Sequence, residues 1–540
     1  EPDKLAMLWV SKHHEEKRFT FKDMKRMSNK TANYFKSLGI KRGDRVMLIL
    51  KRHYQFWFAI LALHKLGAVV IPATNLLMEH DLDYRFKAAG VRALVCTPDG
   101  QVADEALRAA KNCGTVEFLM MANGAREGWL DFDAEVEKQS DVFERTEDTA
   151  CGSDPMLMFF TSGTTGKGKG VMLSQSNICL DMTLGMYNFA ITKKTMNLLP
   201  PHHTFGSTVN YVGHFSQGCE IYISSGLRYM LKEMQEQKPT HLVLVPLFVE
   251  TIYRRIWATA EKSGSAEKLK KGIKISNALR KIGIDKRRKL FADVLNTFGG
   301  KLEMIICGGA ALNQDIIDFF DAIGITILNG YGITECAPLI SCNRNKLQYS
   351  GSVGIPIISE EVKIKNPDEN GEGEICVKGP NVMLGYFDDP EATAAVFDED
   401  GFFRTGDYGR IEEVDGDKWI YITGRLKNLI IFSNGKNVYP EEIETELSRI
   451  RGVLEVVVYA GESKKDPGKE VIVAEIYPDF EQLEADGVAD IQAYFNEHVR
   501  DANARMAPYK KVGLVKIRKT EFVKNTSKKI TRFNIDKSID

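Results

Sequence analysis

The sequence lacks the marks of a membrane-spanning, disulfide-bonded or zinc-binding protein. Its longest apolar runs, residues 56–63 and 242–249, are far too short to cross a bilayer. The nine cysteines are scattered and form no C-x-x-C pair, which argues against a disulfide framework and against a zinc site. Nothing at the N-terminus resembles a signal peptide. We therefore expect a soluble protein of the reducing cytoplasm.

The sequence also lacks a charge imbalance and internal repeats. A formal net charge of −1 gives no reason to expect a nucleic-acid partner. No self-similar period of about 20–50 residues and no low-complexity tract is visible. Apolar residues make up 44% and charged residues 27% of the 540 positions, which is ordinary for a globular enzyme of about two to four domains.

What is present, over residues 20–150, is a regular alternation of helix and strand patterns. Thr20 and Asp23 form a capping-box start for a helix that Gly39 ends. Strands are expected at 46–50, 68–71, 93–96 and 118–121, with a second helix at 54–66. Strands separated by helices of this length predict parallel βαβ units covered on both faces.

The pattern changes near the C-terminus. Residues 454–459 and 470–477 are typical of paired strands, followed by a helix at 490–503 and a strand at 513–517. This predicts a small α+β unit. The last segment, 509–538, holds ten Lys or Arg against two acids, most of which we interpret as solvated surface.

Residues 156–177 contain the most informative loop. An apolar strand, 156–160, runs into the loop Thr161-Ser162-Gly163-Thr164-Thr165-Gly166. Glycines let backbone amides converge on one point and hydroxyls add donors, a combination that suits a polyphosphate; Lys167 and Lys169 add positive charge. A bland Gly/Ser/Thr turn is the alternative. The spacing also imitates a P-loop, but Gly170 stands where that motif needs Ser or Thr for magnesium, so a P-loop kinase is disfavoured.

Four further strings carry readable chemistry. In 329–335, Asn-Gly-Tyr-Gly-Ile-Thr-Glu, Tyr331 can stack on a base, Gly332 allows close approach, Thr334 offers a hydroxyl and Glu335 a metal-binding carboxylate. Asp407 follows a glycine turn, where a helix cap or Asx-turn is the ordinary interpretation. His203 lies in Pro-x-His-x-x-Gly and by itself is more simply a loop or capping histidine. Ser527-Lys528-Lys529-Ile530-Thr531-Arg532 lies near the C-terminus.

Taken together and in their order along the chain, these strings resemble those of the adenylate-forming (AMP-binding) superfamily, the fatty acyl-CoA synthetases in particular. The resemblance covers nearly the whole chain. It implies an α/β fold with a large N-terminal domain of doubly wound sheets, a β-barrel-like subdomain and a small mobile α+β C-terminal domain. It also implies domains at residues 1–426 and 427–540, with a hinge at Lys427, and the use of ATP, Mg²⁺ and coenzyme A.

The resemblance implies roles for individual residues. Lys529 would bridge the substrate carboxylate and the α-phosphate, Thr334 would bind that phosphate, Glu335 would hold magnesium and His203 would lie near the acid. The nucleotide would be held by a larger set, comprising Thr161, Ser162, Gly163, Thr164, Thr165, Gly166 and Lys169 at the phosphates, Gly309, Ala310, Ala311, Tyr331 and Gly332 at the adenine, and Asp407 and Arg425 at the ribose. The loop at Gly435 would enter for the second step.

Three positions depart from the family pattern. Lys528 stands where glycine is usual, Gly168 where proline is usual and Gln175 where histidine is usual. The first departure leaves open which lysine enters the site. The second predicts a looser phosphate loop.

The basic segment 261–301 has two interpretations. Its apolar stripe, Leu290, Phe291, Val294, Leu295 and Phe298, favours a core-packing helix with a solvated basic face. The alternative is a peripheral contact with an anionic membrane that carries the substrate.

The sequence thus predicts ATP-dependent activation of a medium- to long-chain fatty acid to acyl-AMP, followed by transfer to CoA. Residues 1–160 look most like medium-chain enzymes, and residues 286–340 and 425–444 look more like long-chain ones. A carrier-protein or aryl-CoA ligase and a catalytically silent nucleotide-binding relative remain as alternatives, and the oligomeric state is open.

Overall fold

The computed structural model describes the chain except for residues 12–14, 147–148, 162–167, 192, 227, 346, 432–436, 463–469, 525–529, 533–534 and 540. The described residues form two compact units. The first comprises Glu1–Glu361, Val377–Phe403 and Asp417–Trp419, and the second comprises Val362–Cys376, Arg404–Gly416 and Ile420–Asp540. Each unit is described by itself.

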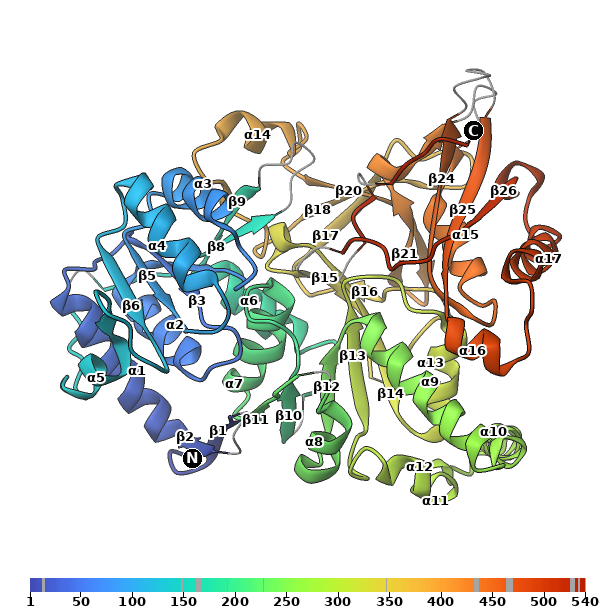
Figure 1. Cartoon of the computed structure of the whole chain (residues 1–540), viewed down its shortest axis with the longest axis horizontal. Coiled ribbons are helices and arrows are strands. Elements are labelled where there is room, and N and C mark those ends of the chain that lie inside the picture. Colours follow the sequence, from blue (N-terminus) through green and yellow to red (C-terminus); the bar gives the residue numbers. More distant parts are fainter. Residues whose placement is uncertain are drawn as a thin grey trace. The chain divides into compact units, whose positions relative to one another are not determined.

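The first unit contains an eight-stranded sheet that follows the predicted alternation (Figure 1). Its strands, in order across the sheet, are β19 (Gly385–Tyr386), β9 (Lys169–Ser174), β8 (Pro155–Thr161), β4 (Val69–Pro72), β3 (Arg45–Ile49), β5 (Ala93–Cys96), β6 (Phe118–Met121) and β7 (Leu130–Asp131). The strands from β8 to β7 are parallel, whereas β8, β9 and β19 pair antiparallel. The expected parallel βαβ units are therefore confirmed.

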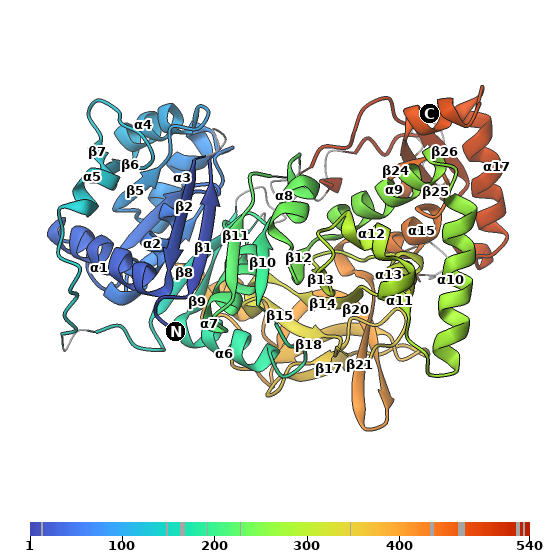
Figure 2. The ribbon, with the colours of Figure 1, turned by 90° about the horizontal axis from the view of Figure 1, so that it is seen from below.

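Helices cover both faces of this sheet (Figure 2). They are α1 (Phe21–Ser37), α2 (Gln55–Leu66), α3 (Glu79–Ala89), α4 (Val102–Cys113) and α5 (Phe132–Glu137). The predicted capping box begins α1: the Thr20 hydroxyl accepts from Asp23 N at 3.1 Å, and Thr20 N donates to the Asp23 carboxylate at 3.0 Å. Gly39, with φ of +76°, follows the end of the helix, as the sequence predicts.

A nine-stranded sheet forms the other half of the first unit. Its order is β16 (Ile355–Pro356), β15 (Leu339–Cys342), β14 (Thr326–Gly332), β13 (Met304–Gly308), β12 (His241–Leu244), β10 (Lys194–Asn197), β11 (Glu220–Ile223), β1 (Leu5–Val10) and β2 (Glu16–Thr20). The strands from β14 to β1 are parallel and the outer ones antiparallel. The carboxyl ends of the parallel strands therefore meet at one edge, where α/β sheets bind ligands.

Two apolar layers sandwich the nine-stranded sheet. One face packs against α8 (Met230–Gln237), α9 (Pro246–Lys262), α10 (Ala266–Lys281), α12 (Ala292–Asn296) and α13 (Gln314–Ile323). The other packs against α6 (Gln175–Gly185) and a π-helix, η1 (Phe205–Gly213), which continues into α7 (His214–Ser216). This two-sided cover is the doubly wound arrangement that the sequence predicts.

Segment 261–301 differs from its predicted form in one respect. The stripe does not lie on a single helix, because α11 (Arg287–Leu290) and α12 are separate short helices with Phe291 between them. Phe291, Leu295 and Phe298 are buried in the core, but Leu290 is 47% exposed. The prediction that Leu290 packs inward is wrong, since the break shifts the helical register.

Most of a four-stranded sheet belongs to the second unit: β17 (Glu361–Lys365), β18 (Gly373–Lys378), β20 (Phe403–Val414) and β21 (Asp417–Arg425). The rest of this unit is the expected α+β arrangement. Its elements are η3 (Leu426–Asn428), β22 (Ile430–Ile431), β23 (Asn437–Val438), α15 (Pro440–Leu447), β24 (Val453–Glu462), β25 (Glu470–Pro478), α16 (Phe480–Ala485), α17 (Ile491–Asn503), η4 (Pro508–Lys510) and β26 (Leu514–Ile517). Helices α15 and α17 pack on the sheet formed by β24, β25 and β26.

Within the described part of the chain, no helix combines the length and apolar character needed to span a bilayer.

Candidate active site

The predicted phosphate loop joins the two strands of a β-hairpin. Thr161 ends β8, Lys169 begins β9, and these two residues face each other in the register. A P-loop runs from a strand into a helix, so the strand that follows here gives a structural reason against a P-loop. Ser162, Gly163, Thr164, Thr165 and Gly166 lie outside the described residues.

Gly168, the departure from proline, has a steric explanation. A Cβ at this position would be 2.7 Å from the carbonyl oxygen of Thr161, closer than real Cβ contacts allow. The carbonyl of Gly168 also accepts a hydrogen bond from the Tyr84 hydroxyl at 3.0 Å. Glycine therefore suits the close approach of the two strands at the base of the loop. The expected looseness of the loop concerns residues outside the described part and stays a prediction.

Three side chains distant in sequence meet beside the hairpin. The ammonium of Lys169 lies 4.9 Å from the centroid of the Tyr386 ring. The Tyr386 hydroxyl donates to a carboxylate oxygen of Glu335 at 3.1 Å. Burial, followed by the negative charge of Glu335, raises the pKa of Tyr386, so its hydroxyl keeps the proton that it donates. The structure thus brings together a cation, a hydroxyl donor and a carboxylate.

Glu335 lies on a short 3₁₀ turn, η2 (Thr334–Cys336), whose backbone carbonyl oxygens accept hydrogen bonds from segment 381–383. The Asn381 amide donates to the carbonyl oxygens of Cys336 at 3.1 Å and Leu339 at 2.7 Å. The carbonyl oxygen of Glu335 itself accepts from Met383 N at 2.8 Å. Segment 380–383 is therefore a clamp on the backbone that carries Thr334 and Glu335.

Asp181, on α6, extends this clamp. One of its carboxylate oxygens accepts from Leu339 N at 3.1 Å and from the Asn381 amide at 3.3 Å. Burial raises the pKa of Asp181, which is fully buried. Burial also raises the pKa of Glu360 to about 8. Two buried carboxyl groups with raised pKa values thus lie behind η2.

Sequence reasoning missed Asn381, Asp181 and Tyr386. Each is separated by 42 or more residues from the part of 334–339 that it contacts. The local signal for Asn381 and Tyr386 is the string 379–386, Gly-Pro-Asn-Val-Met-Leu-Gly-Tyr, whose Gly-Tyr end forms β19.

The nucleotide residues predicted on β13 and β14 lie at the carboxyl ends of those strands. Gly309, with φ of +88°, and the following Ala310 and Ala311 are exposed just after β13. Tyr331 is nearly buried on β14. A Cβ on Gly332 would be 1.9 Å from the carbonyl oxygen of Pro338, so no side chain fits there. This edge offers an open backbone next to a fixed aromatic ring, which suits a flat base.

His203 precedes the π-helix η1, a helix type that occurs often at functional sites. Its carbonyl oxygen accepts from the N–H groups of Gly206 and Ser207. A Cβ on Gly308 would be 3.4 Å from the Phe205 ring, so the start of η1 lies against the end of β13. Burial, and then the neighbouring His203, lowers the pKa of His202, which keeps that ring neutral.

The two predicted ribose residues meet in the second unit. Arg425 Nε lies 3.1 Å from the Asp407 carboxylate, whose side chain is 5% exposed. Asp407 N donates to the Thr405 hydroxyl at 3.1 Å, which fixes the turn. Lys427 lies on the 3₁₀ turn η3 directly after β21, and burial followed by the charge of Arg425 lowers its pKa. A hinge at Lys427 concerns motion and stays a prediction.

Lys529 and Gly435 lie outside the described residues, but the chain beyond Lys529 is anchored. Arg532 donates to the Glu444 carboxylate at 2.6 Å and to the Val458 carbonyl at 3.0 Å. Thr531 N donates to Val523 O at 2.8 Å, so the ends of segment 525–529 are held in the same unit.

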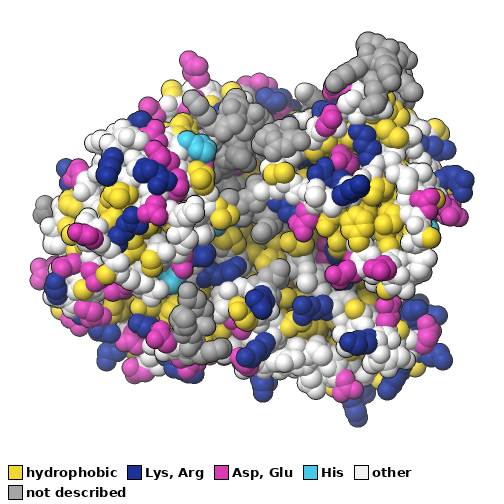
Figure 3. Space-filling model, viewed as in Figure 1, with side chains coloured by type: hydrophobic (Ala, Val, Ile, Leu, Met, Phe, Trp, Pro, Cys, Tyr) yellow, Lys and Arg dark blue, Asp and Glu magenta, His cyan; other side chains and the backbone are white. Residues whose placement is uncertain are grey.

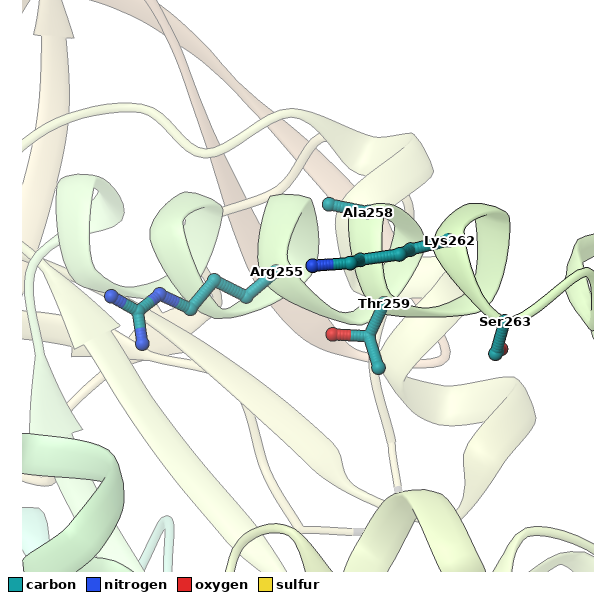
Figure 4. Close-up of a pocket in the computed structure, with 5 residues that line it drawn as sticks. All are labelled: Arg255, Ala258, Thr259, Lys262 and Ser263. Carbon is teal, nitrogen blue, oxygen red and sulfur yellow. The ribbon is translucent and has the colours of Figure 1, made fainter.

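A separate hollow lies on the outer face of α9 (Figure 4). Arg255, Ala258, Thr259, Lys262 and Ser263 line it, and they come from α9 and the residue that directly follows it. None of the predicted site residues is among them, so this surface is not the predicted active site.

Comparison with known proteins decides the family. A model of the family described as AMP-binding enzyme matches residues 1–387. The chain belongs to the AMP-binding enzyme family. This confirms the resemblance to the adenylate-forming superfamily that the sequence motifs indicate.

Several proteins are similar to this AMP-binding enzyme. A feruloyl-CoA synthase of Amycolatopsis sp is 27% identical over 447 residues, which cover 80% of this chain and 79% of the relative. Long-chain-fatty-acid–CoA ligase 5 of Rattus norvegicus is 32% identical over 356 residues, 61% of this chain and 50% of the relative. The crystal structure of ATP-bound MatB from Rhodopseudomonas palustris matches the fold with a TM-score of 0.77 and 24% identity, over 98% of this chain and 94% of that one. The names of the two relatives specify different acids.

Proposed function

We propose that this AMP-binding enzyme joins a medium- to long-chain fatty acid to CoA in two steps, with acyl-AMP between them. The observation that carries the proposal is the meeting of Lys169, Tyr386 and Glu335 beside the β8–β9 hairpin. A polyphosphate and its metal ion need a cation, a hard carboxylate and open backbone in one place. Relatives named as CoA ligases support the thiol acceptor.

In the first step, a carboxylate oxygen of the acid attacks the α-phosphorus of ATP. A P–O bond forms and the bond to the β-phosphate breaks, so pyrophosphate leaves. The chain must hold two anions that repel each other and offset the charge that builds on the phosphate oxygens. Lys169 and the hairpin loop would hold the β- and γ-phosphates, Thr334 the α-phosphate, and Lys529 would bridge the reacting groups.

Magnesium fits the oxygen donors on η2. Among the described residues, no group of three or more His, Cys, Asp or Glu could hold a metal ion. Mg²⁺ commonly takes one or two carboxylates and completes its coordination with phosphates and water. Glu335 would supply the carboxylate, with Tyr386 fixing its orientation. When bound, the ion would neutralise phosphate charge.

In the second step, the CoA sulfur attacks the acyl carbonyl carbon. A C–S bond forms, the thiol proton is lost to solvent, and the bond to AMP breaks. Domains at 1–426 and 427–540, rotating at Lys427, would withdraw Lys529 and bring in the loop at Gly435. Replacing Lys427 by Pro should lock this hinge and slow thioester formation more than adenylation.

An apolar layer beside His203 supports a fatty acid over a polar one. Val209 on η1 packs with Val243, Ile306 and Leu328 of the sheet. Phe205, at the start of η1, joins the same layer. These side chains are packed together in this structure, so an acyl chain that continues from a carboxylate near His203 would have to displace them to reach an apolar environment.

The half-reactions test the assignment of Lys529. Lys529→Ala should lower acid-dependent pyrophosphate exchange by about 1,000-fold or more, because the charge at the reacting groups is lost. It should leave thioester formation from supplied acyl-adenylate within a few fold. Lys528→Ala is the matched control and should keep both pyrophosphate exchange and thioester formation. Equal loss of both half-reactions in Lys529→Ala, or loss of exchange in Lys528→Ala instead, would refute the assignment.

A further inference from the structure

Helix α10 has one buried face and one solvent-facing side of distinct composition. Leu269 and Ser276 are buried, and the Ser276 hydroxyl donates to the carbonyl oxygen of Ala322 at 3.0 Å. This contact fastens α10 to the end of α13. The helical period therefore fixes which residues point away from the core.

The outward face carries exposed isoleucines at regular spacing. Ile275 is 54% exposed and Ile282, seven residues on, is 70% exposed. Ile284, just after the helix, is 41% exposed. A spacing of seven residues places the first two on the same stripe of the helix. Single exposed apolar side chains are ordinary, whereas a group of them along one face marks an interaction site.

Unpaired lysines flank this stripe. Between residues 266 and 289 the sequence has ten Lys or Arg against two acids. Both acids form ion pairs within the segment: Glu267 pairs with Lys270 at 2.8 Å and Asp285 with Arg287 at 2.7 Å. Figure 3 shows Lys and Arg side chains over the part of the surface where Figure 1 draws α9 and α10.

Lys271, Lys274 and Lys281 lie on the same outward side as the isoleucines and are exposed. None of the three has an ion-pair partner among the residues that the structure describes. By contrast, Arg280 and Arg287 are tied to Asp321 of α13 and so belong to the packing of the helix. Three of the lysines without an ion pair in this segment therefore lie on the side of α10 that carries Ile275 and Ile282.

We propose that this outward face of α10, defined by Lys271, Lys274, Ile275, Lys281 and Ile282, is a contact surface for an anionic lipid bilayer. Lysines bind phospholipid headgroups while isoleucines enter the boundary between headgroups and acyl chains. A nucleic acid would pair with the lysines but would leave the isoleucines in water. Because the net charge of the chain is only −1, the attraction is local and would orient α10 toward the bilayer.

Vesicle sedimentation of the full chain tests this surface. The protein should bind mixed phosphatidylserine–phosphatidylcholine vesicles, bind phosphatidylcholine vesicles weakly, and bind the mixed vesicles more weakly, though still measurably, as salt increases. The triple change K271E/K274E/K281E should weaken binding by more than about 100-fold, because the loss of each lysine costs roughly fivefold and each new glutamate adds repulsion. Ile275→Ser with Ile282→Ser should weaken it by about tenfold at high salt, where the apolar contribution dominates.

The matched control reverses three lysines on another face. Lys22, Lys25 and Lys36 on α1 are exposed, and K22E/K25E/K36E changes the net charge by the same amount. This variant should bind within about threefold of the original. Equal loss in both triple variants, equal binding to both kinds of vesicle, or no binding to the mixed vesicles would each overturn the proposal. The last result would direct the search to an acidic protein.

This inference does not depend on the acid that the enzyme activates. All the substituted side chains are exposed, so circular dichroism should be unchanged in each variant. Pyrophosphate exchange with a short, soluble acid should also stay unchanged. Absence of exchange in the unsubstituted protein would count against the proposed function and would leave the vesicle result to be judged separately.

Discussion

Replacing Asn381 by Ala probes the clamp on the Glu335 backbone. The Asn381 amide donates to the carbonyl oxygens of Cys336 and Leu339 and to Asp181. The substitution leaves these fully buried acceptors without that donor. At about 1–3 kcal/mol for each unsatisfied buried group, the free energy of unfolding should fall by about 3 kcal/mol.

The effect on catalysis should exceed the effect on stability. The turn 334–336 would lose the hydrogen bond that the Asn381 amide donates to the Cys336 carbonyl oxygen. A displacement of about 1 Å at a catalytic group can cost about 100-fold in rate. We expect pyrophosphate exchange by Asn381→Ala to fall about 100-fold in folded protein, with more Mg²⁺ needed for half-maximal rate. Exchange would be measured against Mg²⁺ concentration, with the folded fraction followed by circular dichroism.

Asn188→Ala is the matched control. Asn188 is also buried, and its amide donates to two carbonyl oxygens, of Cys342 at 3.4 Å and Ile355 at 3.3 Å, which are not part of the Glu335 segment. This variant should lose stability but keep the Mg²⁺ dependence and most of the exchange rate. If the two variants lost activity equally, or if Asn381→Ala kept the original Mg²⁺ dependence, the clamp would have no role in positioning Glu335.

Two further changes test groups around the same turn. Tyr386→Phe removes the hydroxyl that donates to Glu335. Because a hydrogen bond to a charged group is worth about 1.5–3 kcal/mol, half-maximal pyrophosphate exchange should need about tenfold more Mg²⁺. An unchanged Mg²⁺ titration would contradict this role of Tyr386. Glu360→Gln tests the raised pKa. Since the folded-state pKa of about 8 exceeds the unfolded value of 4.5, the stabilisation from the protonated carboxyl is complete below pH 4.5 and is lost as pH rises to about 8. In urea unfolding, the free energy of unfolding of Glu360→Gln minus that of the original protein should rise by up to about 4 kcal/mol from pH 4.5 to pH 8. A difference that does not change with pH would contradict the raised pKa.

Local chemistry made much of the fold predictable. The Thr20–Asp23 capping box specified the start of α1, and the apolar run 93–96 coincides with β5, because both signals are contained in a few neighbouring residues. The stripe at 290–298 was harder to interpret. A helical period describes one continuous helix, and the break at Phe291 turns Leu290 outward.

The candidate site likewise has one part that could be predicted from neighbouring residues and another part that could not. Its strings of adjacent residues, such as 331–335, can be read directly from the sequence. Its supports cannot, because Asn381 reaches Asp181 across 200 positions and nothing in either segment specifies the partner. The burial that raises the pKa of Glu360 likewise depends on packing between distant elements.

Acid-dependent exchange of pyrophosphate with ATP tests the central claim most directly. The account predicts Mg²⁺-dependent exchange, without CoA, for at least one acid in a panel of straight-chain fatty acids from acetic to stearic acid, with ferulic acid included as an aromatic comparison. Addition of CoA should then convert the same acid to its thioester. Folded protein that binds ATP but catalyses no exchange with any acid of the panel would contradict the account.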